Sequence, residues 1–330
     1  MTAVELLPPG EATPDNPRWH QLRRAGVTAS EIAVVMGLSK WDSPFNLYWS
    51  KVNGWSSEDS EIMSTGRHLE ASIADWWTAQ NPGRVVHAAG LYCRAERSWQ
   101  IATPDRFICD PQWHDNPFPD NPGYEYDHQH DATIEALLEC KWVAYSWDGW
   151  GEPGTDDIPV HYQAQALWQA DVMGVDEVHI AALGPGGFRS YLVRRDENDL
   201  VVMRKAGEEF VRRLVEGDPP PLDSHTATIG ALQRLHPNLG QGAVQVDIEF
   251  AERYRRARAE EKAAAERVTQ CEAEIRALLG SEFNRVMCGK KLVASRSIYE
   301  QSGDSAELTA LDDDWPVVDR LNPGRADSYA

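Results

Sequence analysis

The sequence predicts an α/β fold in which helices flank a central mixed β-sheet. Segments with helical periodicity alternate with short β-like segments along the first two thirds of the chain. The stretch ALLECKWV at 136–143 is an apolar run of the kind found in a buried strand. The 330 residues are 42% hydrophobic and include 13 tryptophans, which is enough apolar material for a substantial packed core.

The first elements combine helices with short strands. A helix is expected around TASEIAVVMGLS, where Thr28 or Ser30 can cap a segment that begins at Glu31 and Gly37 can end it. A second helix is expected over GRHLEASIADWWTAQ, whose apolar residues recur at helical spacing. The runs VVHAAGLYC and WQIATPDRFIC then predict short strands that form a hairpin within 84–110.

A polar insertion at 111–131, rich in proline and aspartate, predicts a surface loop before the strand TIEALLECKWV. Next come a helix at HYQAQALWQADVMG, strands at DEVHIAALG and RSYLVRR, and an amphipathic helix that ends at Gly217. The Pro-rich segment DPPPLD follows, so the main domain is expected over 17–222. Residues 1–16 form an N-terminal extension, and 223–330 form a C-terminal extension.

The C-terminal extension predicts a long helix over 248–279 and a hairpin over 284–299. Apolar residues of the helix follow 4-3 spacing, which Glu261 interrupts, so the helix carries a seam like that of a coiled coil. Two interpretations stay open for this seam. The helix either packs on its own domain or forms an oligomer contact.

Charge and cysteine usage limit the classes of function. The net charge of −20 and pI of 4.9 disfavour a general nucleic-acid binder, although local basic pairs such as Arg23-Arg24 and Arg194-Arg195 can still face a polyanion. The five cysteines are scattered and form no CxxC pair, which argues against a disulfide framework or a zinc site. We find neither a signal peptide nor an apolar run long enough to span a membrane, and therefore expect a soluble, intracellular protein.

A set of carboxylates and a lysine indicates metal-dependent chemistry. Glu139 and Lys141 stand two positions apart inside the apolar strand, so they share one face of the sheet. Asp105 ends an earlier strand and Glu70 lies on a helix, so these groups converge if the strands pair. Carboxylate oxygens are the ligands that Mg²⁺ prefers, and a neighbouring lysine can stabilise charge that develops on phosphorus. Gln163 opens the following helix, where its amide could fix the lysine; an ordinary ion pair is the simpler interpretation of Glu139 and Lys141.

Several motifs together extend this interpretation to a family. The segments WHQLRRAGVTASEI, GRHLEA, ATPD, LLECKW and YQAQALW resemble the phage lambda exonuclease and YqaJ-type viral recombinase family, within the PD-(D/E)XK nuclease superfamily. The resemblance covers roughly residues 17–215. It implies a restriction-endonuclease-like core and Mg²⁺-dependent 5′→3′ digestion of linear double-stranded DNA, with Mn²⁺ as an acceptable substitute.

The resemblance also implies a role for each matching catalytic residue. Asp105 and Glu139 match the metal-ligating acids, and the backbone carbonyl of Cys140 is a further candidate ligand. Lys141 matches the catalytic lysine. The remaining matches are the helical acid, at Glu70, which is also a candidate metal ligand, and the glutamine of the last motif, at Gln163.

A second group of matches concerns the DNA end. Arg23 and Ser30 match the arginine and serine that bind a 5′-phosphate in lambda-type enzymes, while Thr103 stands where those enzymes have a serine. The alternative interpretation is that Ser30 only caps its helix and Arg23 lies on the surface. The polar insertion at 111–131 leaves access to the site open.

The resemblance implies partners as well. Double-stranded DNA ends would be the substrate, a single-strand annealing recombinase the functional partner, and a ring-shaped homotrimer the assembly, in the cytoplasm of a bacterium that carries the phage or prophage. The competing hypothesis is a non-catalytic module that binds or assembles on DNA ends and retains the nuclease fold. The complete set of acids and lysine favours the enzyme. A separate cluster of histidines and aspartates at 127–131 could bind a transition metal, but it is more typical of a polar loop.

Overall fold

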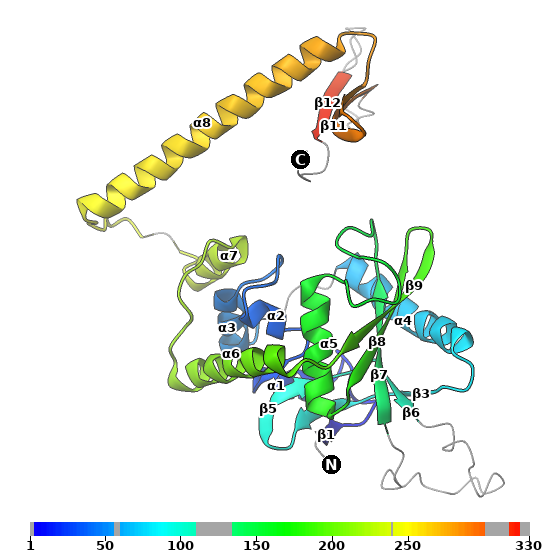
Figure 1. The fold of residues 1–330 in the computed structure, drawn as a ribbon. Helices are drawn as coiled ribbons and strands as arrows, with labels where there is room; N and C mark the ends of the chain where they lie inside the picture. Colours follow the sequence, from blue (N-terminus) through cyan, green and yellow to red (C-terminus); the bar gives the residue numbers. More distant parts are fainter. Residues whose placement is uncertain (1–2, 56–59, 110–133, 239, 301–316, 324–330) are drawn as a thin grey trace, which may run out of the picture. The chain divides into compact units, whose positions relative to one another are not determined.

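The computed structural model describes residues 3–55, 60–109, 134–238, 240–300 and 317–323 (Figure 1). The polar insertion at 111–131, with the histidine and aspartate cluster at 127–131, lies outside the described residues. The chain forms two compact units, Met1–Leu239 and Gly240–Ala330. The first unit therefore extends beyond 222, where the main domain was predicted to end.

The central sheet of the first unit has five strands in the order β3-β6-β7-β8-β9. These are β3 (Val85–Ala88), β6 (Arg106–Cys109), β7 (Ile134–Trp142), β8 (Glu177–Gly184) and β9 (Gly187–Arg194). Strand β7 pairs antiparallel with β6 and parallel with β8, and the other neighbours are antiparallel. The sheet is therefore mixed, as predicted, and β7 lies at its centre.

A second sheet has the strand order β1-β4-β5-β2. Its strands are β1 (Ala3–Leu7), β4 (Leu91–Arg94), β5 (Arg97–Ala102) and β2 (Val27–Thr28). The predicted hairpin within 84–110 is thus wrong in part: β4 and β5 pair with each other here, whereas β3 and β6 belong to the central sheet. The predicted N-terminal extension is also part of the unit, because β1 pairs with β4.

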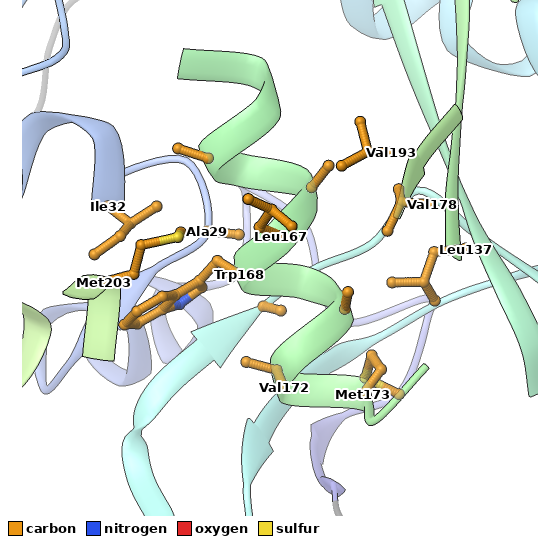
Figure 2. Close-up of a cluster of buried hydrophobic side chains, with 14 of the residues drawn as sticks. Ala29, Ile32, Leu137, Leu167, Trp168, Val172, Met173, Val178, Val193 and Met203 are labelled. Atoms are coloured by element: carbon orange, nitrogen blue, oxygen red, sulfur yellow. The ribbon is translucent and has the colours of Figure 1, made fainter. Parts of the chain in front are cut away.

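Helices α4 (Glu61–Gln80) and α5 (Val160–Met173) pack on opposite faces of the central sheet. Alternate residues of a strand point to opposite faces, and accordingly Leu138 packs with Ile73 and Trp77 of α4, whereas Leu137 lies in the cluster built around α5. Figure 2 shows α5 between two groups of core side chains, with Leu137, Val178 and Val193 on one side and Ala29, Ile32 and Met203 on the other. The result is a layered α/β fold in which α5, the next element after β7 along the chain, has most of its residues buried.

Four further helices of the first unit are described before α7. They are α1 (Pro17–Arg24), α2 (Ile32–Val35), α3 (Pro44–Asn53) and α6 (Glu197–Glu216). Helix α6 ends at Gly217, as predicted, with φ of 72° at that glycine. The predicted capping of α2 is wrong, because its N-cap is Glu31 and no side chain caps it.

Helix α7 (Thr226–Leu235) explains why the first unit continues past 222. It packs on α3, and Thr228 Oγ1 donates to Ser43 Oγ over 2.7 Å in a buried contact. Thr228 and Ala231 are both buried. The Pro-rich segment after Gly217 therefore connects two helices of one unit.

The second unit contains the long helix α8 (Ile248–Leu279) and the antiparallel sheet β10-β11-β12. Its strands are β10 (Arg285–Cys288), β11 (Lys291–Glu300) and β12 (Val317–Pro323). Helix α8 has the predicted bounds, and β10 and β11 form the predicted hairpin, to which β12 adds a third strand. Among the described helices of the whole chain, none has the length and apolar character needed to cross a membrane.

Candidate active site

Strand β7 places Glu139 and Lys141 side by side. The strand is paired on both edges, and the side chains of both residues point to the face that α5 covers. Lys141 Nζ lies 2.5 Å from Glu139 Oε1, and Glu139 is only 3% exposed. The strand alternation that predicted this pair is therefore confirmed, and the carboxylate is held almost fully out of water.

Asp105 reaches the same strand from the turn between β5 and β6. Its Oδ2 accepts a hydrogen bond of 2.7 Å from the backbone N–H of Cys140, the residue between Glu139 and Lys141. Burial first, and then the negative charges of Glu139 and Glu70, raise the pKa of Asp105 well above its usual value. Asp105 therefore lies close enough to Glu139 for the charge of Glu139 to raise the pKa of Asp105 further.

Lys141 provides the positive charge of the site. Burial alone would lower the pKa of Lys141, but the negative charges of Glu139 and Asp105 outweigh burial and raise it above its ordinary value. Its ammonium group also lies 4.9 Å from the centre of the Tyr162 ring. Lys141 is therefore a fixed cation and would not act as a neutral base while both carboxylates are ionised.

Glu70 lies on α4 and is bound to an arginine. Arg106 Nη1 donates to Glu70 Oε1 over 2.6 Å and to the backbone carbonyl of Asp105 over the same distance. Arg106 follows Asp105 at the start of β6, so this link ties α4 to the turn that carries Asp105. Glu70 is thus near Asp105 and Glu139, and its Oε1 is already bound by Arg106.

The structure does not place Gln163 next to Lys141. Gln165 takes that position instead: its Oε1 accepts from Lys141 Nζ over 3.1 Å and its Nε2 donates to Glu139 Oε1. Successive residues of an α-helix are rotated by about 100° around its axis, so the side chains of Gln163 and Gln165 point about 200° apart. Among the described contacts, the side chain of Gln163 makes no hydrogen bond.

Gln169 was not predicted at all. It is fully buried on α5 and its Nε2 donates to Glu139 Oε2 over 2.8 Å. Gln165 and Gln169 are four residues apart, which puts them on one face of the helix. The signal was present in the sequence, because this i, i+4 glutamine pair lies in an otherwise apolar stretch, QALWQA.

The donor set fits Mg²⁺ bound through few protein ligands. Within the described ranges, no group of three His, Cys, Asp or Glu side chains has the arrangement of a complete metal site. Mg²⁺ usually keeps several waters and takes one or two carboxylates together with phosphate oxygens of the substrate. Asp105 and Glu139 supply those two carboxylates. Burial first, and then the charge of Glu139, raises the pKa of Asp105, so a cation bound by both carboxylates would offset their repulsion.

A second group of polar side chains lies where α1 meets β2. Arg23 Nη2 donates to Ser30 Oγ over 3.2 Å, and Ser30 Oγ lies 3.2 Å from Thr28 Oγ1. The guanidinium also lies 4.2 Å from the centre of the Trp19 ring. Burial lowers the pKa of Arg23 in spite of the opposing charge of Glu31. Arg23 and Ser30, which the sequence expected to act together, are therefore in contact.

An ion pair between Lys51 and Glu31 holds the backbone that carries these side chains. Lys51 Nζ, on α3, donates over 2.8 Å both to Glu31 Oε2 and to the backbone carbonyl of Arg23. The same carboxylate oxygen accepts from the backbone N–H of Thr28 over 2.9 Å. Burial would raise the pKa of Glu31, but the positive charges of Lys51 and Arg23 lower it, so the carboxylate stays ionised. Lys51 and Glu31 were not predicted as part of the site.

Thr103 directly follows β5, at the end of the strand that pairs with β2. Strand β2 pairs parallel with β5, with Thr28 opposite Ile101, so the chain two residues further on brings Ser30 and Thr103 to the same end of the sheet. Thr103 Oγ1 is buried and has no hydrogen-bond partner among the described atoms. A buried hydroxyl without a partner is costly unless a ligand satisfies it. The roles assigned to all these residues stay predictions.

Comparison with known proteins agrees with the family indicated by the sequence. Residues 18–176 match the model of the YqaJ-like viral recombinase domain, so the predicted resemblance is confirmed. A curated relative is the uncharacterized protein YqaJ of Bacillus subtilis, which is 25% identical over 225 residues. The match covers 66% of this chain and 62% of that protein, so the chain spans less than two thirds of this relative.

Two solved structures are among those to which the chain is similar. The alkaline exonuclease LHK-Exo of Laribacter hongkongensis is 18% identical, with a TM-score of 0.43, and the match covers 67% of this chain and 97% of that one. A phage related exonuclease from Haemophilus somnus is 11% identical, with a TM-score of 0.41, and the match covers 60% of this chain and 98% of that one.

Proposed function

Since residues 18–176 carry a YqaJ-like viral recombinase domain, we propose that the chain is a Mg²⁺-dependent exonuclease that digests linear double-stranded DNA from 5′ to 3′. One observation supports this most strongly: Glu139 and Lys141 are in contact on the central strand, and Asp105 is hydrogen-bonded to the residue between them. These three groups are those that metal-assisted phosphodiester hydrolysis needs.

In the proposed mechanism, Asp105, Glu139 and the backbone carbonyl of Cys140 would hold Mg²⁺, with Glu70 as a further candidate ligand. The metal would lower the pKa of a bound water and neutralise charge on the scissile phosphate. Lys141, kept cationic by Glu139 and Asp105, would stabilise the negative charge that develops on phosphorus. Gln165 and Gln169 would hold the Glu139 carboxylate in one orientation, since together they donate to both of its oxygens.

We assign the Arg23–Ser30 pair and Thr103 to the terminal 5′-phosphate. An arginine presents a planar fork of N–H donors that matches phosphate, and the hydroxyls of Ser30 and Thr103 can donate beside it. The unpartnered Thr103 Oγ1 and the fixed position of Arg23 support this assignment. A terminal phosphate held here would define which strand is cut and in which direction.

The test is digestion of linear and covalently closed circular duplex, each with Mg²⁺, with Ca²⁺ and with EDTA. We expect linear duplex alone to be degraded, with Mg²⁺ or Mn²⁺ only, and label at the 5′ end to be released first. Retained activity in EDTA would refute the metal mechanism. Binding of duplex ends without turnover in Mg²⁺ would instead support a non-catalytic end-binding module.

The product of this activity would be a long single strand. We propose that a single-strand annealing recombinase takes it up, as the family resemblance suggests, in a phage or prophage recombination system. Co-purification of the chain with such a protein from its native host would test this partnership, and annealing that is unaffected by deletion of the chain would contradict it.

A further inference from the structure

Helix α8 presents a long exposed surface to which the proposed function assigns no role. It spans 32 residues, of which only Leu279 is buried. Large apolar side chains on it are exposed, including Ile248 at 77%, Phe250 at 49%, Tyr254 at 62% and Val268 at 58%. A helix this long gains most of its stability from packing of its apolar face, so this exposure points to a missing partner.

The apolar seam of α8 continues into a groove. The groove has a volume of about 590 Å³ and is formed by the C-terminal half of α8 and by β11 and β12. Its walls are mainly apolar and include four seam residues of α8 and two residues of the sheet: Ala264, Val268, Cys271, Ile275, Val293 and Leu321. The aromatic residues Phe250 and Tyr254 lie at the other end of the same seam. One half of the helix thus carries exposed rings and the other half borders an apolar groove.

We propose that α8 pairs antiparallel with α8 of a second copy of this chain. The proposed register is centred between residues 262 and 263, which sets Tyr254 level with Cys271 of the second copy and Phe250 level with its Ile275. The exposed rings of each copy then enter the groove of the other. The pairing is two-fold symmetric, so each α8 takes one partner helix, and it does not depend on how the first unit assembles.

Charge complementarity selects this register. Taking Tyr254, Glu261, Val268 and Ile275 as heptad position a, the charged flanking residues fall at positions e and g. In the proposed register, Arg253 meets Glu274 of the second copy and Glu260 meets its Arg267 at the g positions, while Arg258 and Glu272 each face an alanine at the e positions. By symmetry both charged pairs occur twice, and both are attractive.

Other arrangements lose this complementarity. A shift of one heptad in one direction brings Glu260 against Glu274 and Arg267 against itself and gains only Arg258 with Glu272. The opposite shift brings Arg253 against Arg267 and sets Glu260 and Arg258 each against itself. A parallel in-register pair brings Arg253 against Arg258 and keeps only Arg267 with Glu272 as an attractive pair. Charges at the rim of an interface add little affinity but suppress wrong registers.

Glu261 is the one charged residue at a core position. It forms an ion pair with Arg258 of its own helix, and in the proposed register it faces Ala264 of the second copy, whose small side chain leaves space beside it. A single polar residue at such a position costs stability and restricts the register. Its presence therefore agrees with one defined pairing.

Disulfide trapping in the full-length chain tests the geometry, independently of any other self-association. All variants carry Cys288→Ala, because Cys288 is an exposed thiol. We expect Tyr254→Cys to form a covalent dimer with Cys271 under mild oxidation, whereas Arg256→Cys, on the outer face of the same turn, does not. With Tyr254 intact, no Cys271–Cys271 dimer should form, because antiparallel pairing holds these thiols about 25 Å apart along the axis. A rapid Cys271–Cys271 dimer would overturn the antiparallel arrangement.

Charge reversal tests the register by sedimentation. We expect Arg267→Glu and Glu260→Arg each to weaken self-association about tenfold or more, because each creates two like-charge contacts. An equimolar mixture of the two variants should restore association, since the mixed dimer again pairs opposite charges. Unchanged association in the single variants, or no recovery in the mixture, would overturn the proposal. Absence of a covalent Tyr254→Cys dimer would do the same and would leave α8 to another occupant, such as the first unit or a different protein.

Discussion

Replacement of Gln165 by alanine is the sharpest test of the proposed active site. Gln165 accepts from Lys141 and donates to Glu139, so it joins the cation and the carboxylate that the mechanism needs. Gln163, two residues earlier on the same helix, is also half-buried and makes no side-chain hydrogen bond within the described structure. Gln163→Ala is therefore a control matched in residue type, helix and burial.

The expected loss follows from the contacts removed. A hydrogen bond to a charged group contributes about 1.5–3 kcal/mol. The site is partly open to solvent, with the Lys141 side chain 15% exposed, so water can replace part of the lost amide. We therefore take about 1.5–3 kcal/mol for both bonds together, which corresponds to a fall in kcat of about 10- to 100-fold. Gln163→Ala should stay within about twofold of the wild-type rate, as expected for a substitution away from any special contact.

Single-turnover digestion of a 5′-labelled linear duplex measures the effect on the chemical step, and thermal unfolding checks that both variants are folded. The KM for DNA should change little, because Gln165 contacts catalytic residues and not the proposed phosphate-binding group. Equal rates for Gln165→Ala and wild type would refute the positioning role. A large loss in Gln163→Ala alone would show that the helix presents a different face to the site during catalysis.

The remaining predictions concern the catalytic lysine candidate, the proposed phosphate-binding residues and the stability of the first unit. Lys141→Ala should keep DNA binding, measured in Ca²⁺, while kcat falls about 100-fold or more, as expected for a group that stabilises transition-state charge. Arg23→Ala should reduce the preference for a 5′-phosphorylated over a 5′-hydroxyl end, and Arg23→Lys should restore it only partly, as initial rates on the two ends would show. Lys51→Met should reduce the same preference by about tenfold without lowering the rate on 5′-hydroxyl ends, because Lys51 holds the backbone carbonyl of Arg23. Asp171 is fully buried and paired with three arginines, so Asp171→Asn should lower the free energy of unfolding at pH 7 by about 3 kcal/mol in urea titration. Burial would raise the pKa of Asp171, but hydrogen bonds from Arg204, Gln100 and Arg195 lower it far below its unfolded value near 3.9, so this difference should persist above about pH 4 and shrink as the pH falls further.

The parts of the site that sequence could predict are those governed by local periodicity. The alternation of a strand was sufficient to place Glu139 beside Lys141, and the structure confirms their contact. The role of Gln165 was not predicted, because the face of α5 that packs on the sheet decides which glutamine reaches Lys141. Gln163 and Gln165 both lie at the start of a helix with apolar residues on most sides, so periodicity alone did not distinguish them.

Long-range pairing limited the prediction of the fold. The runs within 84–110 were correctly expected to be strands, but their neighbours depend on contacts with distant segments. β3 and β6 join the central sheet through β7, whereas β4 pairs with β1 near the N-terminus. The Lys51–Glu31 ion pair was missed for the same reason: its two residues are 20 positions apart and meet only because α3 folds back beneath the segment that carries Arg23.

The proposed 5′→3′ polarity depends on how the two groups of functional residues are joined. Thr103 and Asp105 are separated by one residue, so the Cα atoms of the proposed phosphate-binding threonine and the proposed metal-binding aspartate lie at most about 7 Å apart. On one side, pairing of β2 with β5 brings Ser30 to the end of the sheet that carries Thr103. On the other, the backbone N–H of Cys140 holds Asp105 to the strand of Glu139 and Lys141. Because so short and well-anchored a segment links the two groups, a terminal phosphate bound at Thr103 would leave only the nearest phosphodiester bonds within reach of the carboxylates, and this is the condition for stepwise removal of nucleotides from a 5′ end.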